Sequence, residues 1–126
     1  HCPMASAYEE RLMELTRQYA PQKVAVVAVS VSRLEIDGLA KMQARAKERG
    51  FNFPYLHDAS QQLGRKLGAY TTPHVFVFDS QRKIAYMGAF DDQQDPTRVE
   101  RRYVRDAVDA ILAGRAVATP ESRPRG

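Results

Sequence analysis

The chain has little of what several protein classes require. It holds a single cysteine, Cys2, so it cannot form an intramolecular disulfide and is not a disulfide-stapled secreted domain. No segment approaches the roughly 18 to 20 consecutive apolar residues of a membrane helix. No N-terminal stretch combines a basic start with an apolar centre as a signal peptide does, and no glycine-rich loop suited to phosphate is present.

What is present fits one α/β domain. The 126 residues are 44% hydrophobic and 27% charged, enough for one compact core. Nineteen Lys and Arg residues against fifteen Asp and Glu residues give a mild excess of +4. Part of this excess lies in residues 115–126, which are rich in Pro and Arg and poor in large apolar residues. We therefore expect a folded domain over residues 1–114 and a flexible tail over residues 115–126.

Helical and strand patterns alternate along the chain. Apolar spacing and capping residues predict helices over 3–19, 34–50, 58–69 and 95–112. Runs of β-branched and aromatic residues predict strands over 23–31 and 51–58 and a hairpin over 74–80 and 83–90. The run at 23–31 lacks alternation, which is typical of a parallel, central strand covered on both faces. A helix with an apolar face and a strand covered on both faces need further neighbours, so we expect a central strand upstream of His1.

Cys2 is the first candidate for chemistry. Pro3 suits the first helical position, where its missing N–H loses no hydrogen bond, and this places Cys2 at the N-cap. The positive end of the helix favours a thiolate there, and a protonated His1 acts in the same direction. The alternative is that Cys2 is a small buried apolar residue and His1 a disordered end.

A second segment, "AYTTPHVFVFD" at 69–79, places a proline at the start of a strand. Proline cannot donate to a strand ladder but is accepted at the first residue, where a cis bond to the preceding residue makes a sharp turn. We expect such a bond between Thr72 and Pro73. A proline that only begins the strand, without function, is the alternative.

The two segments together resemble the thioredoxin superfamily, specifically its redoxin branch of thiol-disulfide oxidoreductase-like and AhpC/TSA-related proteins. The resemblance extends from Cys2 to about Leu112 and rests on "HCP", "VAVVAVSVS", the segment 51–79 and "YMGAFDD" in this order. It implies a thioredoxin-like fold, a central mixed β-sheet flanked by helices, whose first core strand precedes His1. It also implies that Cys2 is the nucleophile, and that Thr72 and the cis-proline Pro73 hold an extended thiol substrate.

The chain departs from thioredoxins at Ala5, where the second cysteine of C-x-x-C would stand. Without that internal resolving thiol, three routes remain for Cys2. They are a mixed disulfide resolved by an external thiol such as glutathione, a sulfenic acid formed by peroxide, and a resolving cysteine outside these residues. Redoxin relatives look as though they carry such a cysteine just beyond a tail like the one at 119–126.

We therefore expect an enzyme of thiol-based redox chemistry, with thiol-disulfide exchange ahead of an antioxidant peroxidase. Peroxiredoxins share the proline after the cysteine, but usually have no cis-proline where "TTP" stands here. The rival from another class is a thioredoxin-like module that binds a protein without catalysis. The substrates implied are a protein or glutathione-like thiol or disulfide, or a peroxide. No cofactor, metal, nucleic acid or membrane is implied. The shortage of cysteine favours a reducing, cytoplasmic compartment, and the alternative is an extracytoplasmic location after removal of a leader.

Two further features have weaker claims. His74 follows Pro73 directly and is a candidate auxiliary base beside Cys2, although a surface histidine at a strand start is the more frequent case. Four arginines recur at helical spacing and predict a basic stripe, either a solvated face or a docking strip for an acidic partner. They are Arg98, Arg101, Arg102 and Arg105.

Overall fold

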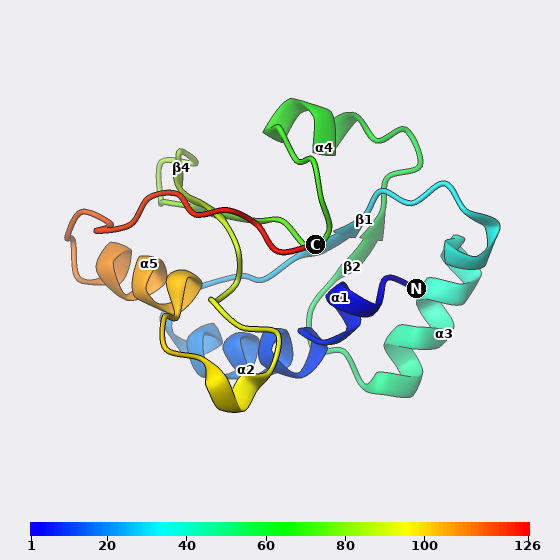
Figure 1. Ribbon diagram of the computed structural model, residues 1–126, viewed down its shortest axis with the longest axis horizontal. Helices are drawn as coiled ribbons and strands as arrows, with labels where there is room; N and C mark the ends of the chain where they lie inside the picture. Colours follow the sequence, from blue (N-terminus) through cyan, green and yellow to red (C-terminus); the bar gives the residue numbers. More distant parts are fainter. The chain divides into compact units, whose positions relative to one another are not determined.

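The computed structural model describes residues 1–126 and consists of short helices and strands (Figure 1). The helices are α1 (Pro3–Ser6), α2 (Glu9–Tyr19), α3 (Leu39–Arg49), α4 (Gln62–Leu67) and α5 (Tyr103–Leu112), with 3₁₀ helices η1 (Ala20–Gln22), η2 (Glu35–Asp37) and η3 (Pro96–Arg98). The strands are β1 (Ala28–Ser30), β2 (Tyr55–His57), β3 (Val75–Phe78) and β4 (Ile84–Gly88). This is the predicted order of helices and strands. None of the helices has the length and apolar character that a bilayer crossing requires.

The chain divides into two compact units. One comprises His1 and Glu9–Tyr70, and the other comprises Cys2–Tyr8 and Thr71–Gly126. The second unit therefore contains Cys2, the Thr72–Pro73 turn and the residues after α5. The predicted domain boundary at residue 114 stays a prediction.

In the first unit, β1 and β2 form a parallel pair in which Ala28 lies opposite Tyr55. The parallel direction was predicted, but the predicted length of β1 is wrong. Lys23 takes a left-handed conformation with φ of 62° after η1, and ladder pairing begins only at Ala28. β1 has a single neighbouring strand, so the central position that its composition predicts is not seen among these residues.

Helices α2 and α3 of the first unit each bury part of their surface, whereas α4 has no buried residue. Leu15 and Tyr19 of α2 and Met42 of α3 are buried apolar side chains. Helix α3 ends where the sequence predicts, at Gly50, whose φ of 67° is the left-handed conformation that glycine adopts without a Cβ penalty. The buried carboxylate of Glu9 accepts hydrogen bonds from Arg45 and Arg49, which gives this unit an ion-pair network as well as an apolar core.

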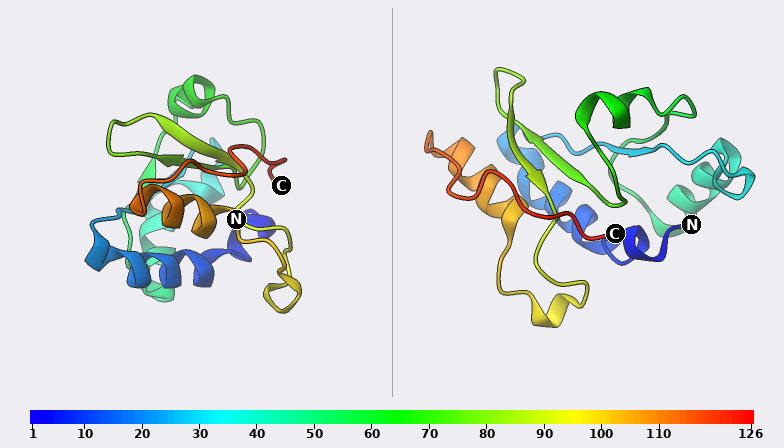
Figure 2. Two further views of the ribbon diagram at one scale, coloured as in Figure 1. Left: turned by 90° about the vertical axis from the view of Figure 1, so that its left-hand side faces the viewer. Right: turned by 45° about the horizontal axis from the view of Figure 1, so that its top comes forward.

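In the second unit, β3 and β4 form the predicted antiparallel hairpin, with Val75 opposite Gly88. Helix α5 lies against both strands (Figure 2) and buries one apolar face. That face is made of Val104, Ala107, Val108 and Ala110. The last predicted helix thus packs on the hairpin through an apolar face; the spacing of apolar residues predicts Val104, Ala107, Val108 and Ile111 for that face, but Ile111 is only half-buried and Ala110 is buried instead.

The predicted start of the last helix at Asp95 is wrong. The Asp95 carboxylate caps η3 by accepting from the Thr97 N–H at 2.9 Å, and α5 begins only at Tyr103. The basic stripe is corrected with it, because Arg98 lies in η3 and Arg101 precedes α5. Arg101 instead lies over the Tyr103 ring, 5.1 Å from its centroid.

The single helix predicted over residues 3–19 is also interrupted. Helix α1 is a separate turn, and Tyr8 closes it with a bond from its N–H to the Ala5 carbonyl at 3.0 Å (Figure 1). The Tyr8 side chain is buried, its hydroxyl donates to the Gln93 carbonyl at 3.3 Å, and its ring packs against Phe90 with centroids 5.8 Å apart. These contacts hold Tyr8 in the second unit, whereas the sequence shows only its helical spacing.

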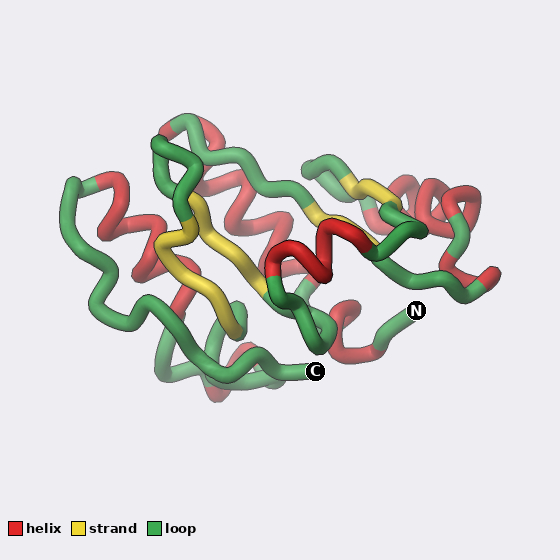
Figure 3. Tube along the Cα trace, turned by 90° about the horizontal axis from the view of Figure 1, so that it is seen from above, coloured by secondary structure: helices red, strands yellow, loops and turns green.

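The segment after α5 runs along the outer edge of β4 (Figures 2 and 3). The Met87 N–H donates to the Pro120 carbonyl and the Ser122 N–H donates to the Met87 carbonyl, both at 3.1 Å, so that Met87 and Glu121 form a parallel bridge. Pro124 is buried. The flexibility of this tail stays a prediction. Its composition did not indicate that it would pair with β4.

Candidate functional site

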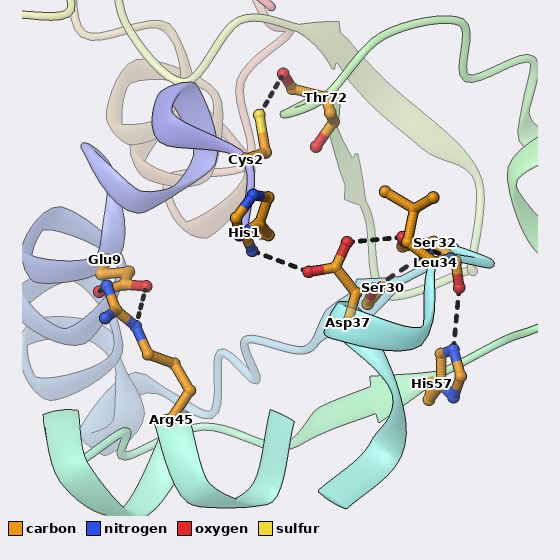
Figure 4. Close-up of polar contacts among 10 residues, drawn as sticks. All are labelled: His1, Cys2, Glu9, Ser30, Ser32, Leu34, Asp37, Arg45, His57 and Thr72. Carbon is orange, nitrogen blue, oxygen red and sulfur yellow. Dashed lines mark hydrogen bonds and ion pairs between the residues drawn. The ribbon is translucent and has the colours of Figure 1, made fainter. Parts of the chain in front are cut away.

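Cys2 is the N-cap of α1, as the sequence predicts, with φ of −65°, ψ of 118° and Pro3 following in the first turn. Its side chain is half-buried and the thiol is free. The sulfur lies 3.8 Å from the carbonyl oxygen of Thr72, which stands 70 positions later in the chain (Figure 4). The second unit thus brings together the two segments that the sequence singles out.

The surroundings of the sulfur differ from the predicted helix terminus. Helix α1 has four residues, closed by a bond from the Ser6 N–H to the Cys2 carbonyl at 3.0 Å, and the Cys2 side chain makes no capping hydrogen bond. The sulfur instead faces a carbonyl oxygen, to which a protonated thiol donates. Since a thiolate has no proton to donate, Cys2 must lose this contact, or at least its hydrogen bond, before it acts as a nucleophile.

The Thr72–Pro73 peptide bond is cis. Thr72 is exposed, Pro73 is half-buried, and the ladder of β3 starts two residues further on, at Val75. Pro73 therefore stands outside the strand, where its missing N–H breaks no ladder bond. The turn presents the Thr72 backbone on the side that Cys2 contacts.

His74 directly precedes β3 and packs against a residue of that strand. Its ring stacks on Phe76 with centroids 4.5 Å apart and planes inclined by 27°. Burial lowers the pKa of His74 from its ordinary value, and the negative charge of Glu121 opposes this shift. An auxiliary role for His74 beside Cys2 stays a prediction.

His1 contributes its amino group to a polar cluster of the first unit. That group lies 3.1 Å from one carboxylate oxygen of Asp37, and the other oxygen accepts from the Ser32 hydroxyl at 2.7 Å (Figure 4). The Ser32 hydrogen bond is the main cause that lowers the pKa of Asp37. The predicted effect of a protonated His1 imidazole on Cys2 stays a prediction.

The structure adds two glycines to the site that the sequence reading missed. Gly88 ends β4 with φ of 147°, and Gly126 lies against the backbone of Thr72. A glycine inside a strand pattern is a signal of close backbone approach, so Gly88 could have been noticed. No local pattern marks Gly126. No group of three or more His, Cys, Asp or Glu side chains could hold a metal ion.

The fold and this site define a thioredoxin-like α/β protein with a thiol beside an X-Pro turn. The family model "AhpC/TSA family" matches residues 1–87, and the chain belongs to that family. It is thereby a member of the redoxin branch of the thioredoxin superfamily. No curated protein matches the chain.

Solved structures agree with this assignment. A hypothetical protein from Sinorhizobium meliloti is 34% identical with a TM-score of 0.84 over 98% of this chain and 72% of its own. An uncharacterized conserved protein from Geobacillus kaustophilus is 32% identical with a TM-score of 0.84 over 98% of this chain and 67% of its own. A thioredoxin-like protein solved in solution in its oxidized form is 22% identical with a TM-score of 0.73 over 91% of this chain and 73% of its own, and shows the fold alone.

Family membership supports thiol-based redox chemistry in general, with thiols or peroxides as the broad class of substrate. The only cysteine of the chain is Cys2. Any thiol chemistry carried out by these residues therefore passes through that sulfur.

Proposed function

We propose that this protein exchanges disulfides through one nucleophile, Cys2, with the Thr72–Pro73 turn positioning the substrate. The observation that carries this proposal is the 3.8 Å contact between the Cys2 sulfur and the Thr72 carbonyl oxygen. A peptide laid along the turn finds backbone donors and acceptors beside the sulfur, as in other cases where an extended chain pairs with exposed backbone. Membership in the AhpC/TSA family supports the same chemistry.

The reaction balances without a cofactor. Cys2 gives up its proton, and its thiolate attacks one sulfur of the substrate disulfide. The bond from Cys2 to that sulfur forms as the substrate S–S bond breaks, and the other half leaves as a thiolate that takes up the proton. An external thiol, as its thiolate, then attacks the substrate sulfur, so that Cys2 leaves as the thiolate and the substrate half is bound to the external thiol.

The need for an external thiol follows from Ala5. A cysteine three residues after the nucleophile lies on the same helix face and resolves the mixed disulfide internally. Helix α1 spans this position, but the residue there is alanine. The mixed disulfide on Cys2 is therefore expected to persist until a thiol of the glutathione class arrives.

Oxidised glutathione provides the test. Wild-type protein should acquire one glutathione on Cys2, seen by mass spectrometry, and keep it until reduced glutathione is added. The Ala5→Cys variant should lose the same adduct without added thiol and end as an internal disulfide, and Cys2→Ser should form no adduct. Exchange is refuted if wild-type Cys2 reacts no faster than the peptide of residues 1–8.

A peroxidase is the second candidate, favoured by the family-model match itself. In that reaction the Cys2 thiolate attacks the peroxide O–O bond, so that a sulfenic acid forms on Cys2 and an alcohol or water leaves. Hydrogen peroxide followed by dimedone traps the sulfenic acid. A dimedone adduct on Cys2 supports the peroxidase, and its absence rejects it. A Cys2 inert to both disulfide and peroxide would instead indicate a non-catalytic binding module.

A further inference from the structure

Residues Pro120–Gly126, which we call the C-terminal strap, are bonded to the end of β4. The Ser122 hydroxyl accepts from the Ala89 N–H at 3.0 Å and shares a hydrogen bond of 2.7 Å with the Tyr86 hydroxyl. The Ser122 N–H donates to the Met87 carbonyl at 3.1 Å. Ser122 is thus the residue through which side-chain and backbone bonds together fix the strap.

Gly88 permits this close approach. A methyl group added at Gly88 would lie 2.9 Å from the Ser122 carbonyl carbon and would overlap the Ser122 carbonyl and hydroxyl oxygens. Any residue other than glycine is therefore excluded at position 88 while the strap is docked. Its φ of 147° also lies in a region that favours glycine.

The far end of the strap covers the turn that Cys2 contacts. A methyl group added at Gly126 would lie 2.5 Å from the Thr72 carbonyl oxygen and 2.9 Å from the Thr72 amide nitrogen, and would overlap the Thr71 hydroxyl oxygen. The strap backbone therefore lies against both hydrogen-bonding groups of Thr72. The same carbonyl oxygen is 3.8 Å from the Cys2 sulfur.

We propose that the C-terminal strap is an internal cover of the Thr72 turn, docked where an extended peptide substrate would pair and released to admit it. The inference rests on the proposed role of Thr72 in substrate binding. A small disulfide needs only the sulfur of Cys2, which is half-buried and reachable. A peptide disulfide also needs the backbone of Thr72, so the docked strap slows the peptide reaction selectively.

Two disulfides separate these cases. One is 5,5′-dithiobis(2-nitrobenzoate), and the other is a ten-residue peptide carrying the same thionitrobenzoate on its cysteine, so both release the same coloured thiol. The Ser122→Ala variant removes the two side-chain bonds of the strap while keeping its N–H. Since each net hydrogen bond corresponds to a factor of about five, release of the strap should become at least about tenfold more frequent. The peptide rate should rise by about this factor, with less than a twofold change for the small disulfide.

Arg123→Ala is the matched control, because Arg123 is an exposed strap residue. It should leave both rates unchanged. Hydrogen exchange at the amides of Met87 and Ser122 reports the strap directly, and both should exchange faster in Ser122→Ala. If those amides lose protection and the peptide rate does not rise, the cover is refuted while exchange at Cys2 stands. If wild-type Cys2 reacts with neither disulfide, the proposed function fails instead.

Steric displacement of the strap end gives a second measure. The Gly126→Ala variant adds a methyl group that would overlap the Thr71 hydroxyl oxygen and lie 2.5 Å from the Thr72 carbonyl oxygen, so the strap end cannot keep its docked position. The peptide rate should rise in this variant, whereas Arg115→Ala, at an exposed position before the strap, should leave it unchanged. An unchanged peptide rate in Gly126→Ala, in protein whose Cys2 reacts with the small disulfide, would overturn the docked position of the strap.

Discussion

The hydroxyl of Tyr86 offers a quantitative test of how the strap and the hairpin depend on each other. Tyr86 has no exposed surface, and its hydroxyl donates to the Ala89 carbonyl at 2.5 Å. The same oxygen meets the Ser122 hydroxyl at 2.7 Å. Burial raises the pKa of Tyr86 to about 12, so the group stays a neutral donor throughout the range in which the protein would be studied.

The Tyr86→Phe substitution removes this hydroxyl and keeps the buried ring. A net intramolecular hydrogen bond contributes about 0.5 to 1.5 kcal/mol, and a buried acceptor left unpaired adds to the cost. Ser122 retains its bond from the Ala89 N–H, but the Ala89 carbonyl loses its donor and the Ser122 hydroxyl loses the Tyr86 oxygen to which it donates. We expect the free energy of unfolding to fall by about 1 to 2 kcal/mol.

Urea unfolding followed by circular dichroism measures this change. Tyr70→Phe is the control, because that side chain is 72% exposed and its substitution should shift stability by less than about 0.5 kcal/mol. The double variant Tyr86→Phe, Ser122→Ala completes a cycle whose coupling energy should reach at least about 0.5 kcal/mol. A coupling of zero would mean that Ser122 does not meet Tyr86 in solution and that the docked strap is wrong.

Two further predictions concern charge. Glu9→Gln should lower the free energy of unfolding by about 1 to 2 kcal/mol, measured in urea, because the buried Glu9 carboxylate accepts three charge-assisted hydrogen bonds from the partly exposed Arg45 and Arg49. Glu10→Gln is the control, because Glu10 forms an exposed ion pair with Arg49, and it should change the free energy of unfolding little. Burial lowers the pKa of His74 in the folded protein, so below about pH 6.5 the unfolded chain binds more protons than the folded protein does. The free energy of unfolding should therefore fall as the pH drops below about 6.5. His74→Phe keeps a ring on Phe76 and should remove that part of the pH dependence, and an unchanged profile would contradict the assignment.

Patterns that are complete within a short stretch were predictable from the sequence. Gly50 marks the end of α3 because only the local backbone decides that conformation. The joint between β3 and β4 is too short for anything but an antiparallel hairpin, and the structure has one. The parallel pairing of β1 was indicated by the absence of alternation, although its length was not.

Two of the failures involve contacts between distant segments. The break before α2 depends on Tyr8 packing against Phe90, which helical spacing does not show. The place of the strap depends on Gly88, whose missing side chain matters only once Ser122 is beside it. In the first case a tertiary contact overrides a local helical preference. In the second case a tertiary contact orders a segment that has no local preference of its own.

The candidate site was predictable only in part. The N-cap position of Cys2 follows from Pro3 alone, but its contact with Thr72 was expected solely because the sequence resembles the redoxins. The predicted effect of the helix on the thiol stays a prediction, and the sequence did not show that α1 is one turn long or that the sulfur faces a carbonyl group. Local sequence thus located the candidate nucleophile, and the fold determines what surrounds it.

The strap also explains how the hairpin keeps its second edge closed. β3 covers one side of β4, and Met87 would otherwise present an unpaired N–H and carbonyl on the other, as exposed edge strands do. Opening the strap uncovers these groups, so release is costly unless something takes its place. A peptide that contacts only Thr72 cannot restore the two bonds of Met87, whereas one that continues along β4 can. If the strap covers the Thr72 turn as proposed, this arrangement favours discrimination by peptide length rather than by a side-chain pocket.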